Sequence, residues 1–334
     1  MLFYENLDKI IFSRNELFNC DELIIVTGYI GPHPVSQLKS LPIKSTVIYG
    51  MYGSDGIRKS LHDALLQENK KLPNTKIVYS TIPVHSKIYI WKKNGEIVHA
   101  LVGSANFSTN GLTTPFKEVL AETTTDTFEL LNKYVNTILD KSIICENAIV
   151  SSNKKKNDRY IDFITYDKDV CSMPLYIMKE NIPIVPEKSG INWGMASLSG
   201  SHVNINDAYI KIDVEMIKNY PQLFPPKQKK PSNDSGKIGH RHNDNIEIIW
   251  DDGTSMIGLL EGTIKTEING IKKMYPKQIS TTPSKSELGK YLRKRLGKND
   301  GELITYEDLK SYGRAYIDVS LQGDGIYYFD FSTK

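Results

Sequence analysis

The first half of the chain alternates short apolar runs with stretches of helical periodicity. The runs at residues 22–29 and 45–50 are mainly apolar and predict buried strands. Further strands are predicted at residues 76–79, 84–92 and 97–103. Apolar residues at helical spacing predict an amphipathic helix over residues 56–71, and a second helix is expected at 127–139. Strands that alternate with helices predict an α/β layered domain.

The second half of the chain has a pattern typical of strands and loops. Strands are predicted at residues 209–214, 246–250, 256–260, 315–321 and 325–331. One helix is predicted, at residues 285–297. The proline-rich stretch 221–234 predicts a long loop, because proline cannot donate to a strand ladder. The polar segment 151–158 is the best candidate for a linker between two domains.

Composition narrows the class of protein. With 334 residues, of which 40% are hydrophobic and 24% charged, the chain is long enough for two globular domains. The net charge of +3 permits nucleic-acid binding without requiring it. No apolar run approaches the roughly 20 residues of a membrane-spanning helix, and no secretory signal is visible. The widely spaced Cys20, Cys145 and Cys171 favour reduced thiols in a cytoplasmic protein, without disulfides or a zinc site.

The candidate chemistry lies in two short motifs. His85 and Lys87 are two residues apart on a predicted strand, so their side chains share a face. Ser104 follows 17 residues after Lys87, and Asn106 shares its face. An imidazole can attack phosphorus while lysine, serine and asparagine side chains hold the non-bridging phosphate oxygens. Because an ammonium and several hydrogen-bond donors can neutralise the phosphate, this set needs no metal ion or other cofactor.

These motifs resemble those of a known family. H-x-K at residues 85–87, followed by G-S-x-N at residues 103–106, is the signature of the phospholipase D superfamily. Within it, GSANFSTNGL with the following Lys117-Glu118-Val119 is similar to restriction endonucleases of the NgoFVII type and the related BfiI enzyme. The resemblance implies a phospholipase D-like α/β/α layered catalytic domain. It also implies that DNA is hydrolysed through a phosphohistidine intermediate.

The acid that orients the histidine is where the sequence departs from the superfamily. Lys92 occupies the position of the usual aspartate. In nucleases that lack the aspartate, a downstream glutamate orients the nucleophilic histidine, and Glu118 stands at the matching place. Glu122 is a weaker candidate on the same predicted strand face. The catalytic set implied by the resemblance is His85, Lys87, Ser104, Asn106 and Glu118.

The H-x-K motif occurs once in the chain. Superfamily chemistry uses two histidines, one as nucleophile and one as general acid for the leaving oxygen. The second histidine must therefore come from another copy, which predicts a homodimer joined through the catalytic domain, with the active site on its two-fold axis. The remaining histidines lack the motif. We interpret His33, His62 and His99 as surface or packing residues, and His240 and His242 as part of a solvated loop rather than a metal site.

A basic helix is predicted in the second half of the chain. Residues 285–298 carry six basic residues and one acid. The apolar stripe of this helix leaves four basic side chains toward solvent, which suits DNA phosphates. These four are Lys290, Arg293, Lys294 and Lys298. The alternative is a solvated helix surface that binds nothing.

The family resemblance extends into this half, at residues 191–194, 206–210, 287–297, 304–314 and 327–332. It implies a mostly-β, seven-stranded pseudobarrel whose two recognition arms enter the major groove, one at residues 193–206 and one around residues 273–286. Lysine and asparagine are common readers of base edges. The candidate DNA-binding residues are Trp193, Ser201, His202, Asn204, Asn206, Lys273, Lys277, Lys285 and Arg293.

These features predict a type II site-specific restriction endonuclease that binds double-stranded DNA. The expected organisation is a catalytic and dimerisation domain at residues 1–155, a linker region at 156–185 and a DNA-binding pseudobarrel at 186–334. The resemblance implies a cognate DNA methyltransferase as partner in one restriction-modification system, and no membrane partner. The alternatives are a non-specific phosphodiesterase and a DNA-binding module on an inactive phospholipase D-like scaffold.

Overall fold

The computed structural model describes residues 1–150, 170–227, 243–268 and 270–333. By internal contacts the chain divides into two compact units, one of residues 1–159 with 253–255 and 322–326, and one of the remaining residues. The predicted linker at 151–158 lies outside the described residues, as do His240, His242 and part of the proline-rich loop. None of the described helices is long and apolar enough to cross a membrane.

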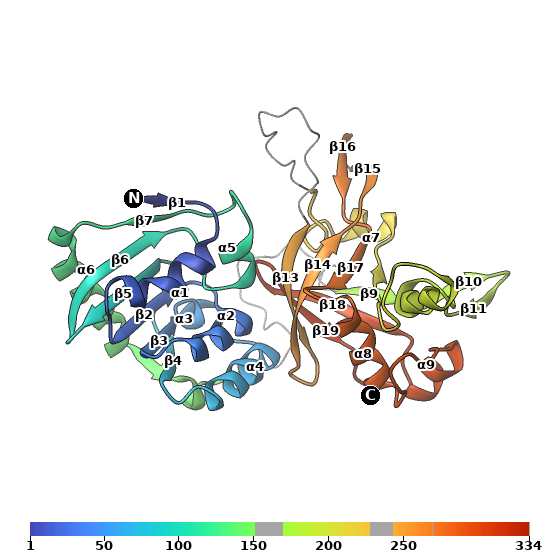
Figure 1. Cartoon of the computed structure of the whole chain (residues 1–334), viewed down its shortest axis with the longest axis horizontal. Coiled ribbons are helices and arrows are strands. Elements are labelled where there is room, and N and C mark those ends of the chain that lie inside the picture. The colour runs from blue at the N-terminus through green and yellow to red at the C-terminus, as the bar shows by residue number, and fades with distance from the viewer. Residues whose placement is uncertain (151–169, 228–242, 269, 334) are drawn as a thin grey trace. The chain divides into compact units, whose positions relative to one another are not determined.

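The first unit is built on an eight-stranded sheet (Figure 1). In spatial order its strands are β1 (Leu2–Phe3), β7 (Leu120–Glu122), β6 (Glu96–Gly103), β5 (Lys87–Lys93), β2 (Glu22–Thr27), β3 (Lys44–Tyr49), β4 (Thr75–Ser80) and β8 (Ser142–Ile144). The neighbours β2, β3 and β4 run parallel, whereas β5 is antiparallel to β2 and β6 is antiparallel to β5. Parallel strands are apolar along their whole length when both faces of their sheet are covered. The apolar run at residues 22–29 fits this pattern.

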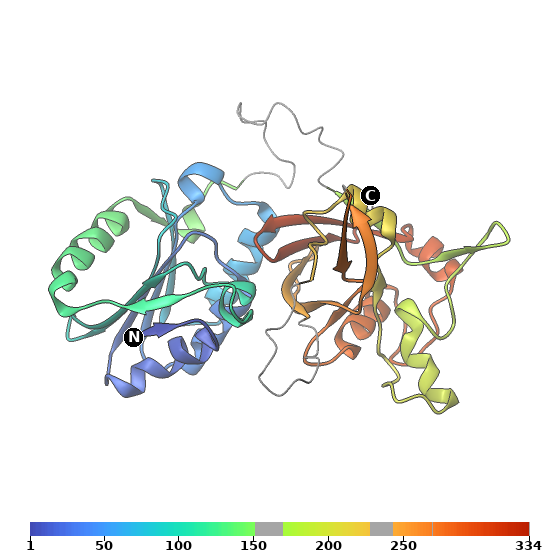
Figure 2. The same ribbon diagram turned by 90° about the horizontal axis from the view of Figure 1, so that it is seen from above.

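Helices cover both faces of this sheet. They are α1 (Leu7–Leu17), α2 (Pro32–Gln37), α3 (Tyr52–Asp55), α4 (Lys59–Lys70), α5 (Thr109–Thr113) and α6 (Phe128–Asp140). Val135 and Ile138 of α6 share a core cluster with Ile24 of β2. Leu23 and Ile25, which alternate with Ile24, are also buried and face the opposite side. Figure 2 shows α6 on one side of the sheet and α1 on the other, which confirms the expected α/β/α layers.

The second unit contains a seven-stranded sheet that curls into a nearly closed barrel. Its strands, in spatial order, are β12 (Ile210–Lys211), β17 (Gln278–Thr281), β14 (Ser255–Glu261), β13 (Asp244–Trp250), β19 (Ile326–Asp330), β18 (Tyr316–Gly323) and β9 (Cys171–Pro174). Two hairpins, β10–β11 (Ile177–Lys179 and Ile182–Ile184) and β15–β16 (Ile264–Ile268 and Ile271–Tyr275), form separate two-stranded sheets. The helices are η5 (Gly190–Ser199), α7 (Val214–Asn219), α8 (Ser286–Arg295) and α9 (Tyr306–Tyr312). The predicted pseudobarrel is thus confirmed.

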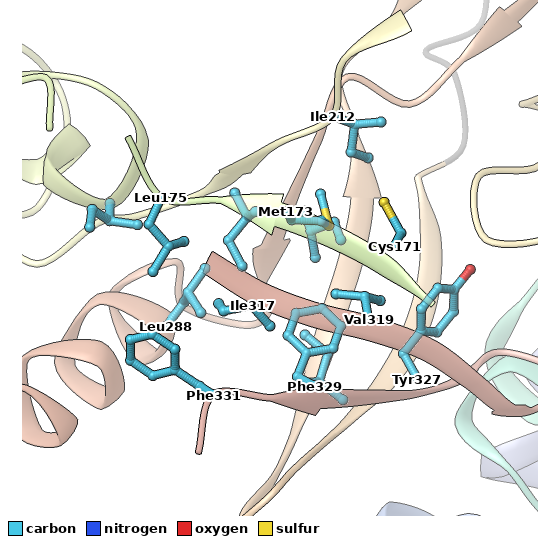
Figure 3. Packing of buried hydrophobic residues seen from close by; sticks show 14 of the residues in the cluster. Cys171, Met173, Leu175, Ile212, Leu288, Ile317, Val319, Tyr327, Phe329 and Phe331 are labelled. Carbon is cyan, nitrogen blue, oxygen red and sulfur yellow. The ribbon is translucent and has the colours of Figure 1, made fainter. Parts of the chain in front are cut away.

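One apolar core fills the second unit. Figure 3 shows Met173 of β9 packed with Ile317 and Val319 of β18 and with Phe329 of β19. These strands contribute every second residue to the core, as expected for a sheet with one buried face. Leu288 of α8 joins the same cluster, so the helix packs against the barrel through its apolar stripe.

Three boundaries differ from the sequence predictions. The predicted strand at 84–92 begins only at Lys87, because the Val84 amide donates to the Gly50 carbonyl instead of joining a strand ladder. The predicted strand at 209–214 pairs only at Ile210–Lys211, since the chain enters α7 at Val214. Strand β9 lies inside the range 156–185 predicted as linker, and it pairs with β18 at the sheet edge.

Candidate active site

Three strand ends meet at one edge of the first sheet. Lys87 begins β5, and its register partner is Gly103 at the end of β6. On the other side of β5 lies β2, which ends at Thr27. The pairing therefore brings the H-x-K motif beside the G-S-x-N motif, although 17 residues separate Lys87 from Ser104 in the chain.

His85 and Lys87 form a close pair at this edge. The Lys87 Nζ lies 2.9 Å from Nδ1 and 3.4 Å from Nε2 of His85, and it donates to the His85 carbonyl oxygen at 2.5 Å. Lys87 is buried whereas His85 is exposed. Burial lowers the pKa of Lys87, an effect that nearby Glu118 opposes. The edge thus combines an inward cation with an accessible imidazole.

Asn106 and Ser104 complete the same edge. Asn106 is buried, and its Oδ1 accepts a hydrogen bond from the Tyr29 amide at 3.0 Å. Ser104 is exposed, and its Oγ accepts from the Val119 amide at 3.1 Å, while the Ser104 amide donates to the Val119 carbonyl at 3.0 Å. Hydrogen bonds to the backbone of Tyr29 and Val119 therefore hold both residues of the motif at this edge.

The two candidate orienting acids occupy different environments. Glu118 lies close enough to act electrostatically on Lys87, but among the described residues no hydrogen bond joins it to His85. Glu122 lies on β7, opposite Leu101 of β6, where its carboxylate pairs with Arg14 at 3.4 Å and lies 4.0 Å from His99. Glu118 is therefore the acid at this edge, and Glu122 belongs to a separate charged cluster.

Gly28 is a site residue that the sequence analysis missed. A Cβ atom on Gly28 would lie 3.1 Å from both the Lys87 Nζ and the His85 Cδ2, and 3.3 Å from the Asn106 Oδ1. The three candidate side chains thus converge on the one residue that has no side chain of its own. The sequence feature that could have indicated Gly28 is the Thr-Gly step directly after an apolar run. The carboxyl end of a parallel strand often borders a functional site.

Two more glycines hold the backbone of the site together. A Cβ on Gly50 would lie 2.0 Å from the Val84 carbonyl oxygen, and one on Gly103 would lie 2.0 Å from the Val119 carbonyl oxygen. Val84 precedes His85 and Val119 follows Glu118. These close approaches, open only to glycine, fix both segments against the strand ends.

The second unit brings Trp193 and Lys285 together. The Lys285 Nζ lies 5.1 Å from the Trp193 ring centroid and donates to both carboxylate oxygens of Glu261 at 2.9 Å. Glu261 is buried, which raises its pKa, but the bonds from Lys285, Gln278 and Ser280 outweigh this and leave the pKa below its ordinary value. Lys285 therefore forms an ion pair with Glu261 within the second unit, and it also lies beside Trp193 of the predicted recognition arm.

The other predicted DNA-binding residues differ in exposure. The exposed ones are Ser201, His202, Asn204, Lys273 and Lys277. Asn206 is buried, and its Oδ1 accepts from the Gly301 amide at 2.7 Å. Lys290 and Lys294 of α8 are exposed as predicted, while Lys298 pairs with Glu302 and Asp308.

The prediction that Arg293 faces solvent is wrong. Its side chain is 0% exposed. The Nε donates to the Glu302 carbonyl at 2.8 Å and one terminal nitrogen donates to the Gly289 carbonyl at 3.2 Å. Gly289 and Arg293 share a helix face that packs against the backbone, as a Cβ on Gly289 would lie 1.9 Å from the Asn206 carbonyl oxygen. The apolar stripe predicted one buried face of the helix and gave no indication of this second one.

The burial of Lys87 predicts a stability cost at the site. Its lowered pKa means that folding disfavours the charged form, so the unfolded chain binds more protons between the two pKa values. We expect Lys87→Met, which keeps the shape without the charge, to raise the Tm at pH 7 by about 2–4 °C. The gain should shrink as pH rises toward the ordinary lysine pKa of about 10.4. Calorimetry with the exposed Lys76→Met as control measures this, and a lower Tm for Lys87→Met would contradict it.

Comparisons with known proteins match both units. The family described as NgoFVII restriction endonuclease N-terminal PLD domain matches residues 5–152. The one described as NgoFVII C-terminal B3-like DNA-binding domain matches residues 164–322. A search of curated protein sequences gives no match.

Several solved structures are similar to part of the chain. NucT from Helicobacter pylori is 22% identical with a TM-score of 0.32, and the match covers 43% of this chain and 97% of that one. A polyphosphate kinase from Porphyromonas gingivalis is 14% identical with a TM-score of 0.30, covering 48% of this chain and 26% of that one. Nuc, a phospholipase D family member from Salmonella typhimurium, is 12% identical with a TM-score of 0.28, covering 41% and 88%.

The family assignment rests on the two domain matches. They belong to one family, follow each other in the same order as the two sheets and together span more than half of the chain. The chain therefore belongs to the NgoFVII restriction endonuclease family and joins a PLD-type nuclease domain to a B3-like DNA-binding domain.

Proposed function

We propose that this protein cuts double-stranded DNA at specific sites, as a type II restriction endonuclease, without a metal ion. The observation that carries the proposal is the juxtaposition of Lys87, His85 and Asn106 around Gly28 at the sheet edge. An imidazole beside a buried ammonium and an amide is a set that can attack a phosphodiester and hold its oxygens.

Neutralisation of the phosphate is assigned to three side chains. Lys87 supplies a full positive charge from a buried position, where an electrostatic interaction is stronger than in water. Asn106 supplies an amide donor, and Ser104 a hydroxyl whose oxygen already accepts from the Val119 amide. Charge-assisted hydrogen bonds of this kind are the usual means of binding phosphate without a metal.

The proposed reaction has two displacement steps. A ring nitrogen of His85 attacks phosphorus, the bond to the leaving DNA oxygen breaks, and that oxygen takes a proton from the partner's His85. Water then attacks the phosphorus of the phosphohistidine, the P–N bond breaks, and the partner's His85 takes a proton from that water. The cycle restores both imidazoles and needs no external oxidant, reductant or nucleotide.

Glu118 is proposed to orient His85 indirectly. Its carboxylate acts on Lys87, and Lys87 contacts both the ring and the carbonyl of His85. The acid therefore favours the charged form of the lysine that fixes the histidine. The role of the missing superfamily aspartate is thereby assigned to an electrostatic interaction that acts through Lys87, rather than to a direct carboxylate–imidazole bond.

Site selection is assigned to the second domain, at residues 186–334 in the sequence-based division. The exposed Ser201, His202 and Asn204 suit base contacts, and the exposed Lys273 and Lys277 suit phosphate contacts. We further propose that the enzyme acts in the cytoplasm beside a cognate DNA methyltransferase, which would protect the same sites.

The central test is digestion of a plasmid of known sequence in EDTA, followed by mapping of the cut ends. We expect cleavage at one short sequence without added metal. His85→Ala should lose at least about 10³-fold in cleavage rate, by analogy with loss of other nucleophiles, and should still retain the target DNA in a gel-shift assay. Cleavage by His85→Ala, or a strict Mg²⁺ requirement, would refute the mechanism.

The shared active site makes a prediction of its own. A heterodimer of one wild-type copy and one His85→Ala copy, purified with two different tags, should cut at less than about 1% of the wild-type rate, because each step needs both histidines. The control is a heterodimer of two wild-type copies with the same tags. Half of the wild-type rate in the mixed dimer would show that each subunit cuts alone.

Gly28 provides a test of the site geometry. The methyl group of Gly28→Ala would press on Lys87, His85 and Asn106 at 3.1–3.3 Å. We expect the cleavage rate to fall about 10²-fold, the size of effect that a small misplacement of catalytic groups produces, with DNA affinity unchanged. Single-turnover kinetics and a gel-shift assay measure the two quantities. An unchanged rate would mean that the three side chains do not converge on this residue during catalysis.

A further inference from the structure

We propose that Thr27 is a positioning residue for DNA cleavage, which sets the Asn106 carboxamide so that its Nδ2 faces the phosphate. The inference rests on the proposed function, in which Asn106 binds the phosphate. Thr27 ends β2, and neither of the two sequence motifs contains it.

The Thr27 hydroxyl joins two segments of the site. It is fully buried, donates to the Tyr29 carbonyl at 2.6 Å and accepts from the Phe107 amide at 2.9 Å. Phe107 directly follows Asn106, and Tyr29 leads out of β2. One hydroxyl therefore ties the end of β2 to the G-S-x-N segment, with its donor and an acceptor site both in use.

The same segment fixes which way the Asn106 amide points. The Tyr29 amide donates to the Asn106 Oδ1 at 3.0 Å, and the Thr27 Oγ1 lies 3.4 Å from the same oxygen. Because a backbone N–H can only donate, the oxygen of the carboxamide must face β2. The Nδ2 is then the group left to face a substrate. With the opposite orientation, the oxygen would face the phosphate oxygens and repel them.

Backbone pairing continues this connection beyond Thr27. Ile30 and Phe107 form a parallel bridge, and the Gly31 amide donates to the Phe107 carbonyl at 2.9 Å. The exit of β2 therefore runs beside the residues that follow Asn106. The Thr27 hydroxyl lies at the start of this pairing, next to Gly28, where the catalytic side chains converge.

The experiment compares Thr27→Val, which keeps the shape but loses the hydroxyl, with Thr27→Ser, which keeps the hydroxyl. We expect Thr27→Val to lower the single-turnover cleavage rate about 10–100-fold, with the DNA concentration at half-saturation changed less than about threefold. Thr27→Ser should restore the rate to within about threefold of wild type. Ser45→Ala is the matched control, because Ser45 on the neighbouring β3 is buried and its hydroxyl has no hydrogen-bond partner in the described part of the chain.

A double-mutant cycle separates positioning from a merely structural role. If Thr27 acts through Asn106, Thr27→Val should reduce the rate less than about threefold further in an Asn106→Ala background. Thermal unfolding of each variant identifies any that fail to fold. If Thr27→Val fails to fold, Thr27→Cys takes its place in the comparison. The cleavage rate of Thr27→Cys should be lower than the rates of wild type and Thr27→Ser, and higher than the rate of Asn106→Ala.

The outcomes distinguish this inference from the function on which it rests. Three outcomes would overturn the role of Thr27 and leave the proposed function intact. The first is a fully active Thr27→Val beside an impaired Asn106→Ala, and the second is a Thr27→Ser as defective as Thr27→Val. The third is a double variant in which the two rate losses simply multiply. A fully active Asn106→Ala would refute the proposed phosphate contact, and the role of Thr27 with it.

Discussion

The register of the β5–β6 hairpin is the constraint on which the candidate site depends. Asn94 and Gly95 both adopt left-handed backbone conformations at its turn, as a tight two-residue hairpin connection requires. The pairing that follows sets Lys87 opposite Gly103, with one irregularity at Trp91 and Lys92. A slip of one residue would turn the Lys87 side chain to the other face of the sheet and away from Asn106. The turn at the far end of the hairpin therefore fixes the strand register, and the register determines which side chains lie together at the site.

The sequence predicted those parts of the fold and site that depend on local patterns. The apolar runs located the central strands, and the two short motifs located His85 and Asn106. Gly28 escaped prediction because its importance comes from neighbours that are distant in the sequence and adjacent only across strands. Arg293 was wrongly predicted to be exposed for a related reason. Helical periodicity shows which side chains are apolar, but it does not show which buried backbone carbonyls can accept hydrogen bonds from a guanidinium.

The buried cations of this chain are compensated to different degrees. In the second unit, Lys285 is matched by Glu261, and Arg295 by Asp251 at 2.9 Å, whereas the buried Arg293 is held by two backbone carbonyls. In the first domain, Lys87 has hydrogen-bond acceptors on His85 but no direct ion pair in the described residues, and Glu118 acts on it from a distance. Full pairing stabilises a scaffold, whereas an incompletely compensated cation leaves an attraction for an incoming anion.

The inward position of Lys87 has a consequence for the response to salt. Lys273 and Lys277 are exposed, and in the proposed function they contact phosphate. Such contacts release counterions from DNA, so their contribution to binding would weaken as ionic strength rises. The Lys87 ammonium is withdrawn from solvent and is screened far less. In the proposed function, added salt would therefore weaken the encounter between protein and DNA, while bond breaking in the assembled complex would be largely insulated from it.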